Sequence, residues 1–221
     1  MNDVFSVFSN SDPTNVSSAV KLLLLLTVLS LAPSILILMT SFTRIVIVLS
    51  FVRTALATQQ MPPNQVIVGL ALFLTFFIMA PTFQEVNKEA LQPLFSEKIG
   101  IEEAYDRASV PFKEFMSKHT RQKDLDLFLK YNKADKPASV EEIPLTMLVP
   151  AYALSELKTA FQIGFMIFIP FLVIDMIVAS TLMSMGMMML PPVMISLPFK
   201  ILLFVLVDGW YLVMKSLLQS F

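Results

Sequence analysis

Four long apolar runs constrain this chain more than any other feature of its sequence. They occupy roughly residues 19–43, 64–83, 161–190 and 193–218. Each run is near or above the ~20 residues that an α-helix needs to cross the hydrocarbon core of a bilayer. Only 15% of the 221 residues are charged, against about a quarter in an average soluble chain. The sequence therefore predicts an all-α, polytopic membrane-type protein with four helical spans.

Polar residues concentrate in one block, residues 84–144, which holds ten Lys/Arg and twelve Asp/Glu. Its apolar residues recur at helical spacing, which predicts a small helical subdomain. Two apolar clusters are expected there, one formed by Phe112, Phe115 and Met116 and one by Leu125, Leu127, Phe128 and Leu129. Loops are expected near Pro111 and Pro137. The predicted organisation is a polar segment (1–20), a first apolar hairpin (21–83), this subdomain (84–144) and a second apolar hairpin (145–221).

The basic residues near the first two runs give an expected orientation. No lysine or arginine precedes Lys21, whereas a secretory signal normally opens with a positive region. Residues 1–20 are therefore compatible with an uncleaved signal-anchor or with a cleaved segment. Arg44 and Arg53 are the only charges between the first two runs, and such charges in short loops favour the cytoplasm. We expect residues 84–144 to face outward and the turn of the second hairpin inward.

Prolines interrupt or border the apolar runs, and each removes a backbone donor and kinks or ends a helix. Freed carbonyls at membrane depth are tolerated only inside protein or beside water. We therefore expect broken helical hairpins packed into an assembly, with Pro150 at a helix start. The prolines concerned are Pro33, Pro81, Pro150, Pro170, Pro191 and Pro198.

Asp175 and Lys200 each interrupt an apolar helix, where an uncompensated charge costs at least ~2.5–3.5 kcal/mol. If the hairpin turns near residue 190, the two lie at depths that differ by roughly 7 Å. We expect them to pair, more readily between neighbouring copies of the chain than within one hairpin. The alternative is that Lys200 extends to an interface while Asp175 meets water.

A polar stripe on the helix that follows Pro150 indicates a polar neighbour, a channel or solvent. Its members, at three- to four-residue spacing, are Ser155, Glu156, Thr159 and Gln162. Asp208 is a third deep acid, beside Trp210 and Tyr211 as interface anchors.

Methionines crowd the turn of the second hairpin, around Gly186. Unbranched thioether side chains re-pack around changing shapes, so this turn could form a compliant constriction that gates a pore. The alternative is that these methionines simply fill the hairpin core. They are Met183, Met185, Met187, Met188 and Met189.

No catalytic grouping emerges from the sequence. It contains no glycine-rich phosphate loop, no metal-ligand cluster, no nucleophile with a nearby base and no cysteine. His119 is expected to be a solvated surface residue without chemistry. We therefore expect no enzymatic activity, no cofactor and no nucleic-acid partner.

Several segments together resemble the FliP family, the core export-gate subunit of the flagellar type III secretion apparatus. The resemblance covers about residues 35–221, whereas residues 1–20 show no clear match. The segments that carry it are Ser41–Val46, Thr58–Asn64, Pro150–Gly164, Ile169–Asp175, Met185–Pro192, Leu197–Lys200 and Leu203–Trp210.

The resemblance implies a ring of five copies in the bacterial inner membrane, within the flagellar basal body. Partners would be FliQ- and FliR-like membrane proteins, other export-apparatus subunits, membrane lipid and unfolded export substrates in transit. It implies a pore gasket at Met187, Met188 and Met189, charge contacts at Asp175 and Lys200, and a subunit contact at Glu156. Family hairpins lie largely above the membrane plane, so hydropathy overstates the number of conventional spans.

Three other functions remain open on sequence alone. A virulence-type secretion homologue shares the same motifs. A proton or small-molecule carrier could use Asp175, Lys200 and Glu156 as a relay, although four spans without an inverted repeat give it little support. A structural scaffold without a pore is the third.

Overall fold

The structure is a computed structural model that describes residues 23, 26, 27, 30, 33–35, 37–58, 60–134, 137–187 and 189–221. The chain divides into two compact units, Met1–Ile37 and Leu38–Phe221. In the first unit, every residue that the structure describes is helical. The predicted polar segment 1–20 and Met188 lie outside the described residues.

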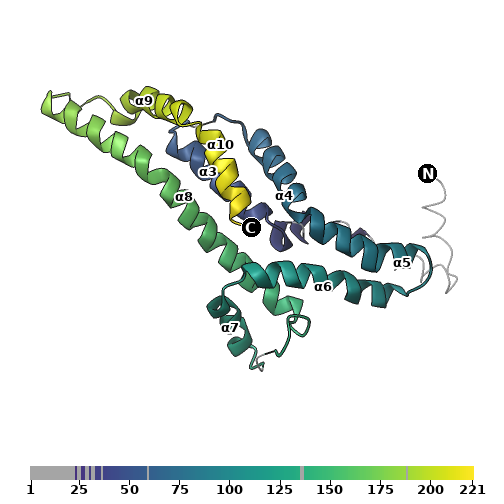
Figure 1. Ribbon diagram of the computed structural model, residues 1–221. Coiled ribbons are helices and arrows are strands. Elements are labelled where there is room, and N and C mark those ends of the chain that lie inside the picture. Colours follow the sequence, from purple (N-terminus) through teal and green to yellow (C-terminus); the bar gives the residue numbers. More distant parts are fainter. Residues whose placement is uncertain are drawn as a thin grey trace, which may run out of the picture. The chain divides into compact units, whose positions relative to one another are not determined.

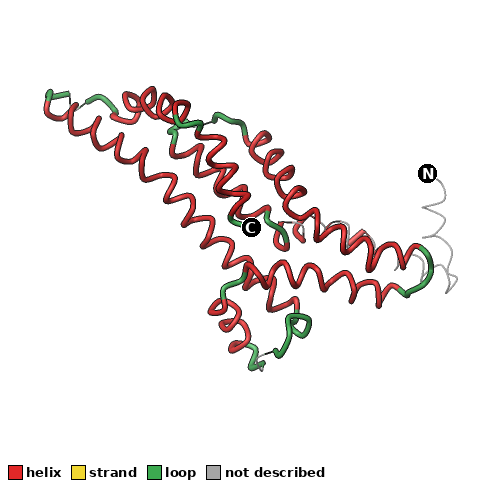
Figure 2. Tube along the Cα trace, viewed as in Figure 1, coloured by secondary structure: helices red, strands yellow, loops and turns green. Residues whose placement is uncertain are grey.

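The second unit is built from helices, with no strand among the residues that the structure describes (Figures 1 and 2). This confirms the all-α prediction. Two helices are long and apolar enough to cross a membrane, Asn64–Phe95 and Leu145–Ser184, and up to four spans result if each bent helix pair counts as one. The elements are α3 (Phe42–Ala55), α4 (Asn64–Val86), the π-helical turn η1 (Asn87–Leu91), α5 (Gln92–Phe95), α6 (Ile101–His119), α7 (Gln122–Tyr131), α8 (Leu145–Ser184), α9 (Pro192–Leu206) and α10 (Gly209–Gln219).

Most of the prolines do not break the helices where the sequence predicted, although Pro191 does lie directly before the start of α9. Pro150 lies inside α8, which begins at Leu145, so the expected helix start at Pro150 is wrong. Pro111 lies inside α6, so the expected loop there is wrong as well. A proline removes one hydrogen bond, and a long helix keeps many others, so packing can hold it continuous. Pro81, Pro170 and Pro198 likewise lie within helices.

The bend in the second hairpin falls instead at Val207–Asp208, between α9 and α10, whose axes differ by 63°. Asp208 has the left-handed φ of 51° that begins α10, and its side chain is exposed. Gly209 follows it because a Cβ at this position would lie 2.3 Å from the Phe204 ring. The broken-helix prediction is therefore confirmed for this hairpin, with a different cause for the break.

Helix α3 is the centre of the larger apolar core and packs against α4 and α8. Ile45, Val48, Leu49 and Val52 follow the three- to four-residue spacing of one helix face and are at most 1% exposed. Figure 1 shows α3 lying beside α10 and between the longer helices. Because α3 is enclosed on several sides, it fixes the positions of the elements that carry the buried charges.

A second core joins α6 and α7 to the first half of α8. Met116, Leu125 and Leu129 pack there against Tyr152, which is fully buried and whose hydroxyl donates to the Thr40 carbonyl at 3.0 Å. Leu127, which the sequence placed in this cluster, is 56% exposed because it lies on the opposite face of α7.

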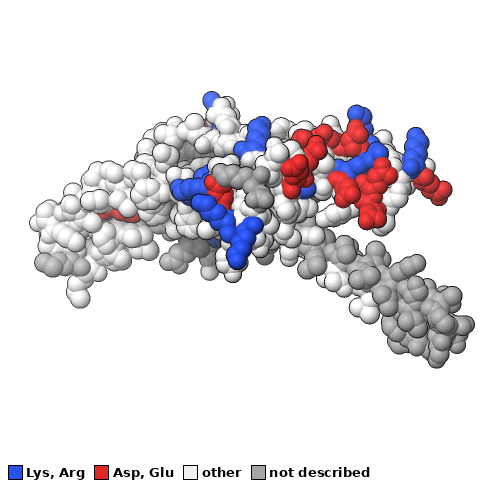
Figure 3. All heavy atoms as spheres, turned by 90° about the horizontal axis from the view of Figure 1, so that it is seen from below, with Lys and Arg blue, Asp and Glu red and all other residues white. Residues whose placement is uncertain are grey.

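Charged side chains gather over the polar subdomain on the face shown in Figure 3, whereas the end formed by α8 and α9 shows few of them. Arg44 and Arg53 both lie inside α3. They are therefore not charges in a short loop, which the expected membrane orientation required. Arg53 bonds instead with the Asn64 side chain and the Pro62 carbonyl. The orientation of the turn and subdomain stays a prediction.

Candidate functional site

The methionine loop, defined here as Met185–Pro191, joins α8 to α9 at the far end of the hairpin (Figure 1). Gly186 has a φ of +75°, which glycine adopts at little cost, and the Met187 amide closes the helix end on the Leu182 carbonyl at 3.0 Å. Met189 is 99% exposed. Met183, Met185 and Met187 are exposed as well. In this chain the described methionines of the loop therefore do not fill the hairpin core.

Asp175 and Lys200 form an ion pair below the loop, with Nζ at 2.6 Å from Oδ2. The Ser196 hydroxyl donates to the other carboxylate oxygen. The pair joins α8 to α9 within one chain, so the pairing is confirmed, while contacts of these residues between copies stay a prediction. Helix α8 ends at Ser184, nine residues after Asp175, and α9 begins at Pro192, eight residues before Lys200. Asp175 and Lys200 therefore lie at matching distances from the turn. The mismatch of roughly 7 Å expected from the sequence arose because the turn was placed near residue 190.

A second ion pair is enclosed between α3 and α8. The Arg44 guanidinium donates to Glu156 through Nε at 2.8 Å and through Nη2, in a bidentate contact. Arg44 is 3% exposed and Glu156 is fully buried. A buried charge is tolerated when it is paired and hydrogen-bonded, which is the case for both groups. The polar stripe on α8 thus meets a polar neighbour, one of the alternatives raised by the sequence.

The C-terminal residues complete the Arg44 site. Arg44 Nη1 donates to the Ser220 carbonyl at 2.6 Å, and its guanidinium carbon lies 3.8 Å from the centre of the Phe221 ring. A planar guanidinium stacks well on an aromatic face. This contact holds the end of α10 against α3 and α8.

A third polar contact joins the polar subdomain to α8. The Ser155 hydroxyl donates to Asp124 at 2.7 Å, and the Arg121 amide donates to Ser155 at 3.0 Å. Burial raises the pKa of Asp124, but the Ser155 hydroxyl and the Arg121 guanidinium lower it by more, so the net pKa lies below its ordinary value. Asp124 is therefore a carboxylate at neutral pH and ties α7 to α8.

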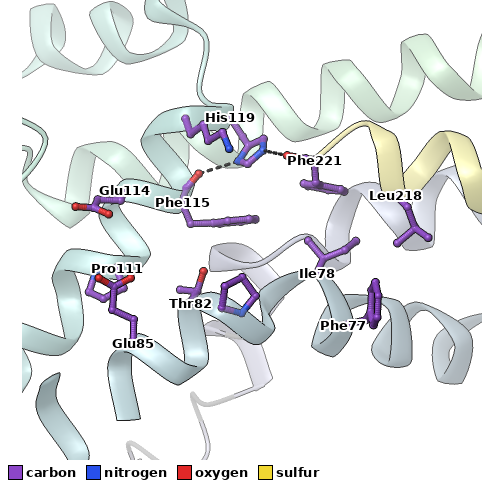
Figure 4. A pocket seen from close by; sticks show the side chains of 12 residues that line it. Phe77, Ile78, Thr82, Glu85, Pro111, Glu114, Phe115, His119, Leu218 and Phe221 are labelled. Atoms are coloured by element: carbon purple, nitrogen blue, oxygen red, sulfur yellow. Dashed lines mark hydrogen bonds between the residues drawn. The ribbon is translucent and has the colours of Figure 1, made fainter. Parts of the chain in front are cut away.

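A cavity of about 530 Å³ lies between α4, α6 and the C-terminus (Figure 4). His119 is half-buried beside this cavity. The sequence predicted a solvated surface residue, so that prediction is wrong. Its ring nitrogens lie 2.8 Å from the Phe115 carbonyl oxygen and 3.4 Å from the Phe221 oxygen. Among the described residues, no group of three or more His, Cys, Asp and Glu could hold a metal ion.

The sequence pointed to some of these residues and missed others. Asp175, Lys200 and Glu156 are each in an ion pair, whereas their predicted role in contacts between copies stays a prediction. Asp208, expected as a deep acid, is exposed at the helix break. The missed partners are Arg44, Ser196, Ser220 and Phe221, and only Arg44, a cation in an apolar segment, carried a signal.

Fold and sites together define an all-helical membrane protein with broken hairpins, enclosed ion pairs and an exposed methionine loop. The FliP family model matches residues 25–217, so the chain belongs to the FliP family. It is 78% identical, over the full length of both chains, to the flagellar biosynthetic protein FliP of Bacillus subtilis. It is 55% identical to the same-named protein of Aquifex aeolicus, covering 94% of this chain and 87% of that one.

A further relative, FliP of Caulobacter vibrioides, is 55% identical over 91% of this chain and 76% of its own length. The Bacillus relative aligns with residues 1–20 too, where the sequence had suggested no match. Family membership makes the chain a component of the flagellar export apparatus, not an enzyme. It resides in the inner membrane at the flagellar basal body.

Proposed function

We propose that this chain is the pore-forming core subunit of the flagellar type III export gate and that Met187, Met188 and Met189 form its gasket. Copies of the chain, five by the family resemblance, surround a channel together with FliQ- and FliR-like membrane proteins. Unfolded flagellar proteins cross the cytoplasmic membrane through this channel. The methionine loops of the copies close around the passing chain.

The observation that carries this proposal is the exposure of the methionine loop. Met189 is 99% exposed in the loop that follows a 40-residue helix. Apolar thioethers presented to solvent by one chain need a partner surface, because exposed apolar patches mark interaction sites. Convergence of the loops from several copies would give each methionine such a surface.

Flexible side chains suit this role for a mechanical reason. An extended polypeptide presents a new side chain every ~3.3 Å, so the constriction must fit a changing cross-section. Methionine has three rotatable bonds and no branch, so it re-packs at low cost. A rigid collar would jam on large side chains or leak ions around small ones.

The Asp175–Lys200 ion pair supports this proposal. Asp175–Lys200 holds the two arms of the hairpin together below the loop. The predicted polar subdomain, residues 84–144, would then lie outside the cytoplasm and the hairpin 145–221 would carry the gasket. Contacts between copies through Asp175, Lys200 or Glu156 remain part of the proposal.

Replacing Met187, Met188 and Met189 together with alanine tests the gasket. We expect ion leak through the purified oligomer in a lipid bilayer to rise at least tenfold, with the oligomer mass unchanged. The matched control is Met61→Ala, which removes a methionine outside the hairpin that is 67% exposed and should leave conductance unchanged. Unchanged conductance of the triple variant would contradict the gasket, and no conductance in any variant would favour a scaffold without a pore.

A further inference from the structure

Charges of opposite sign are unevenly distributed within the polar part of the chain: carboxylates predominate towards one end, with some basic side chains among them (Figure 3). From Glu85 to Asp106 there are six carboxylates and two lysines. From Lys113 to Lys133 there are six basic residues and three carboxylates. A mixed surface would keep both signs interspersed, so this uneven distribution calls for an explanation.

The acidic patch, defined here as Glu102 and Asp106, lies on one face of α6. The two residues are one helical turn apart and both are exposed. Like charges at this spacing destabilise a helix slightly. Glu103 pairs with Arg107 at 2.6 Å, whereas Glu102 and Asp106 have no ion-pair partner within the ranges that the structure describes. Their charges are therefore available to another molecule.

The basic patch, defined here as Arg121, Lys123 and Lys158, lies where α7 meets α8. Arg121 binds Asp124 through Nη2, while its Nε and Nη1 are enclosed without a hydrogen-bond partner among the described residues. Lys123 and Lys158 are exposed and lie within electrostatic reach of each other and of Arg121. Three cations held together repel one another, and a carboxylate surface brought against them would remove that cost.

We propose that the basic patch of one copy receives the acidic patch of a second copy of this chain. This inference rests on the proposed function, in which several copies surround a channel, and it names the surfaces that join them. Each copy carries both patches, so a head-to-tail contact can repeat from copy to copy, and such contacts generate rings when the rotation closes. Complementary charge also sets the register of the contact and speeds its formation.

An anionic lipid headgroup is the other occupant that a cationic patch at an apolar helix could take. It would use Arg121, Lys123 and Lys158 but would leave the acidic patch without a role. The second copy accounts for both patches with residues that the chain itself supplies, and for that reason we favour it.

Charge reversal on each patch tests the contact. One variant carries Glu102→Lys and Asp106→Lys, a second carries Lys123→Glu and Lys158→Glu, and a third carries all four substitutions. Native mass measurement of the full-length oligomer in detergent gives the association state of each. We expect at least tenfold weaker association in the first two variants and recovery in the third, with salt weakening the wild-type oligomer.

Two controls separate this result from misfolding and from failure of the pore. Lys158→Ala alone relieves repulsion with Arg121 and Lys123 without adding a negative charge near Asp124, so the single chain should be at least as stable as wild type while association still weakens. Glu141→Lys reverses an exposed acid outside the patch and should leave association unchanged.

Three outcomes would overturn the inference. The first is wild-type association in both two-site variants. The second is weakened association in the basic-patch variant alone, which indicates lipid. The third is no recovery in the four-site variant although its helical circular dichroism matches wild type. Bilayer conductance is not part of this readout, so assembly by other surfaces would leave the gasket proposal standing.

Discussion

At the scale of single residues, two ion pairs hold charges inside an otherwise apolar helical fold. Lys200 is 3% exposed and Asp175 is 28% exposed, while Arg44 and Glu156 are almost wholly enclosed. Such a pair adds little net stability compared with apolar residues, but removing one member leaves an uncompensated buried charge. The pairs therefore specify which faces of the helices meet.

Removing Asp175 should cost more than removing the whole pair. Asp175→Asn leaves the Lys200 ammonium enclosed without a counter-charge, and breaking a buried pair in this way costs about 3–5 kcal/mol. Adding Lys200→Met removes that charge and should restore part of the loss. Thermal unfolding of the two single variants and the double variant in detergent measures the coupling. Losses that simply add would show that the two residues do not depend on each other.

Asp124 should make the attachment of α7 acid-sensitive. Its pKa lies below the ordinary value in the folded chain, with burial opposed by Ser155 and Arg121. The stabilisation is present above the unfolded pKa of about 3.9 and is lost as pH falls through the folded pKa. We expect the wild-type Tm to fall steeply below about pH 4.

The matched comparison for this pH effect uses two substitutions. Asp124→Asn should lower the Tm at pH 7 and flatten its decline in acid, whereas Glu141→Gln, at an exposed acid, should change neither. A decline as steep in Asp124→Asn as in wild type would assign the acid sensitivity to other carboxylates.

The sequence identified one ion pair and missed the other, for a physical reason. Asp175 and Lys200 stand out because each interrupts an apolar helix in the same hairpin, where a partner is close along the chain. Arg44 and Glu156 are 112 residues apart, and sequence spacing gives no signal for such a contact. Arg44 was instead interpreted as a loop charge, because the apolar run was expected to end before it.

At the scale of helices, a close contact between α3 and α8 depends on Gly164. A Cβ added there would lie 2.5 Å from the Phe51 ring, and Phe51 also packs edge-on against Phe161 with ring centres 5.3 Å apart. The absence of a side chain at Gly164 lets the two helices approach, as small residues do in packed membrane helices.

Gly164→Ala should therefore destabilise the fold, although alanine favours a helix over glycine by about 0.8–1 kcal/mol. Gly69→Ala in α4 is the matched control, because nothing lies within 4 Å of its added Cβ. The expected result is a lower Tm for Gly164→Ala and an unchanged or higher Tm for Gly69→Ala. Equal shifts in the two variants would show that the contact with Phe51 adjusts without cost.

Helix content could be predicted from the apolar runs, but helix boundaries could not. The runs predicted membrane-type helices, and the structure has two that are long and apolar enough to cross a bilayer. The sequence placed breaks at prolines, yet α8 continues through Pro150 and Pro170. Tertiary packing decides whether a proline ends a helix, and one sequence does not show that packing.

At the scale of the whole molecule, much of the apolar surface of α8 has no partner within the part of the chain that is described. Phe165, Met166 and Met176 are each more than half exposed. Exposed apolar surface of this extent needs lipid or other subunits to cover it. Such a surface is expected of a component of a membrane assembly. This agrees with membership of the FliP family.

The most direct test of the central claim uses the absence of cysteine from the sequence. Met189→Cys places a single thiol in the methionine loop, and Tyr131→Cys places one at a position on α7 that is 86% exposed. An export substrate held in transit and carrying one cysteine should form a disulfide with Met189→Cys and not with Tyr131→Cys. A substrate held in transit that links to neither variant, or to Tyr131→Cys as readily, would contradict a gasket formed by this loop.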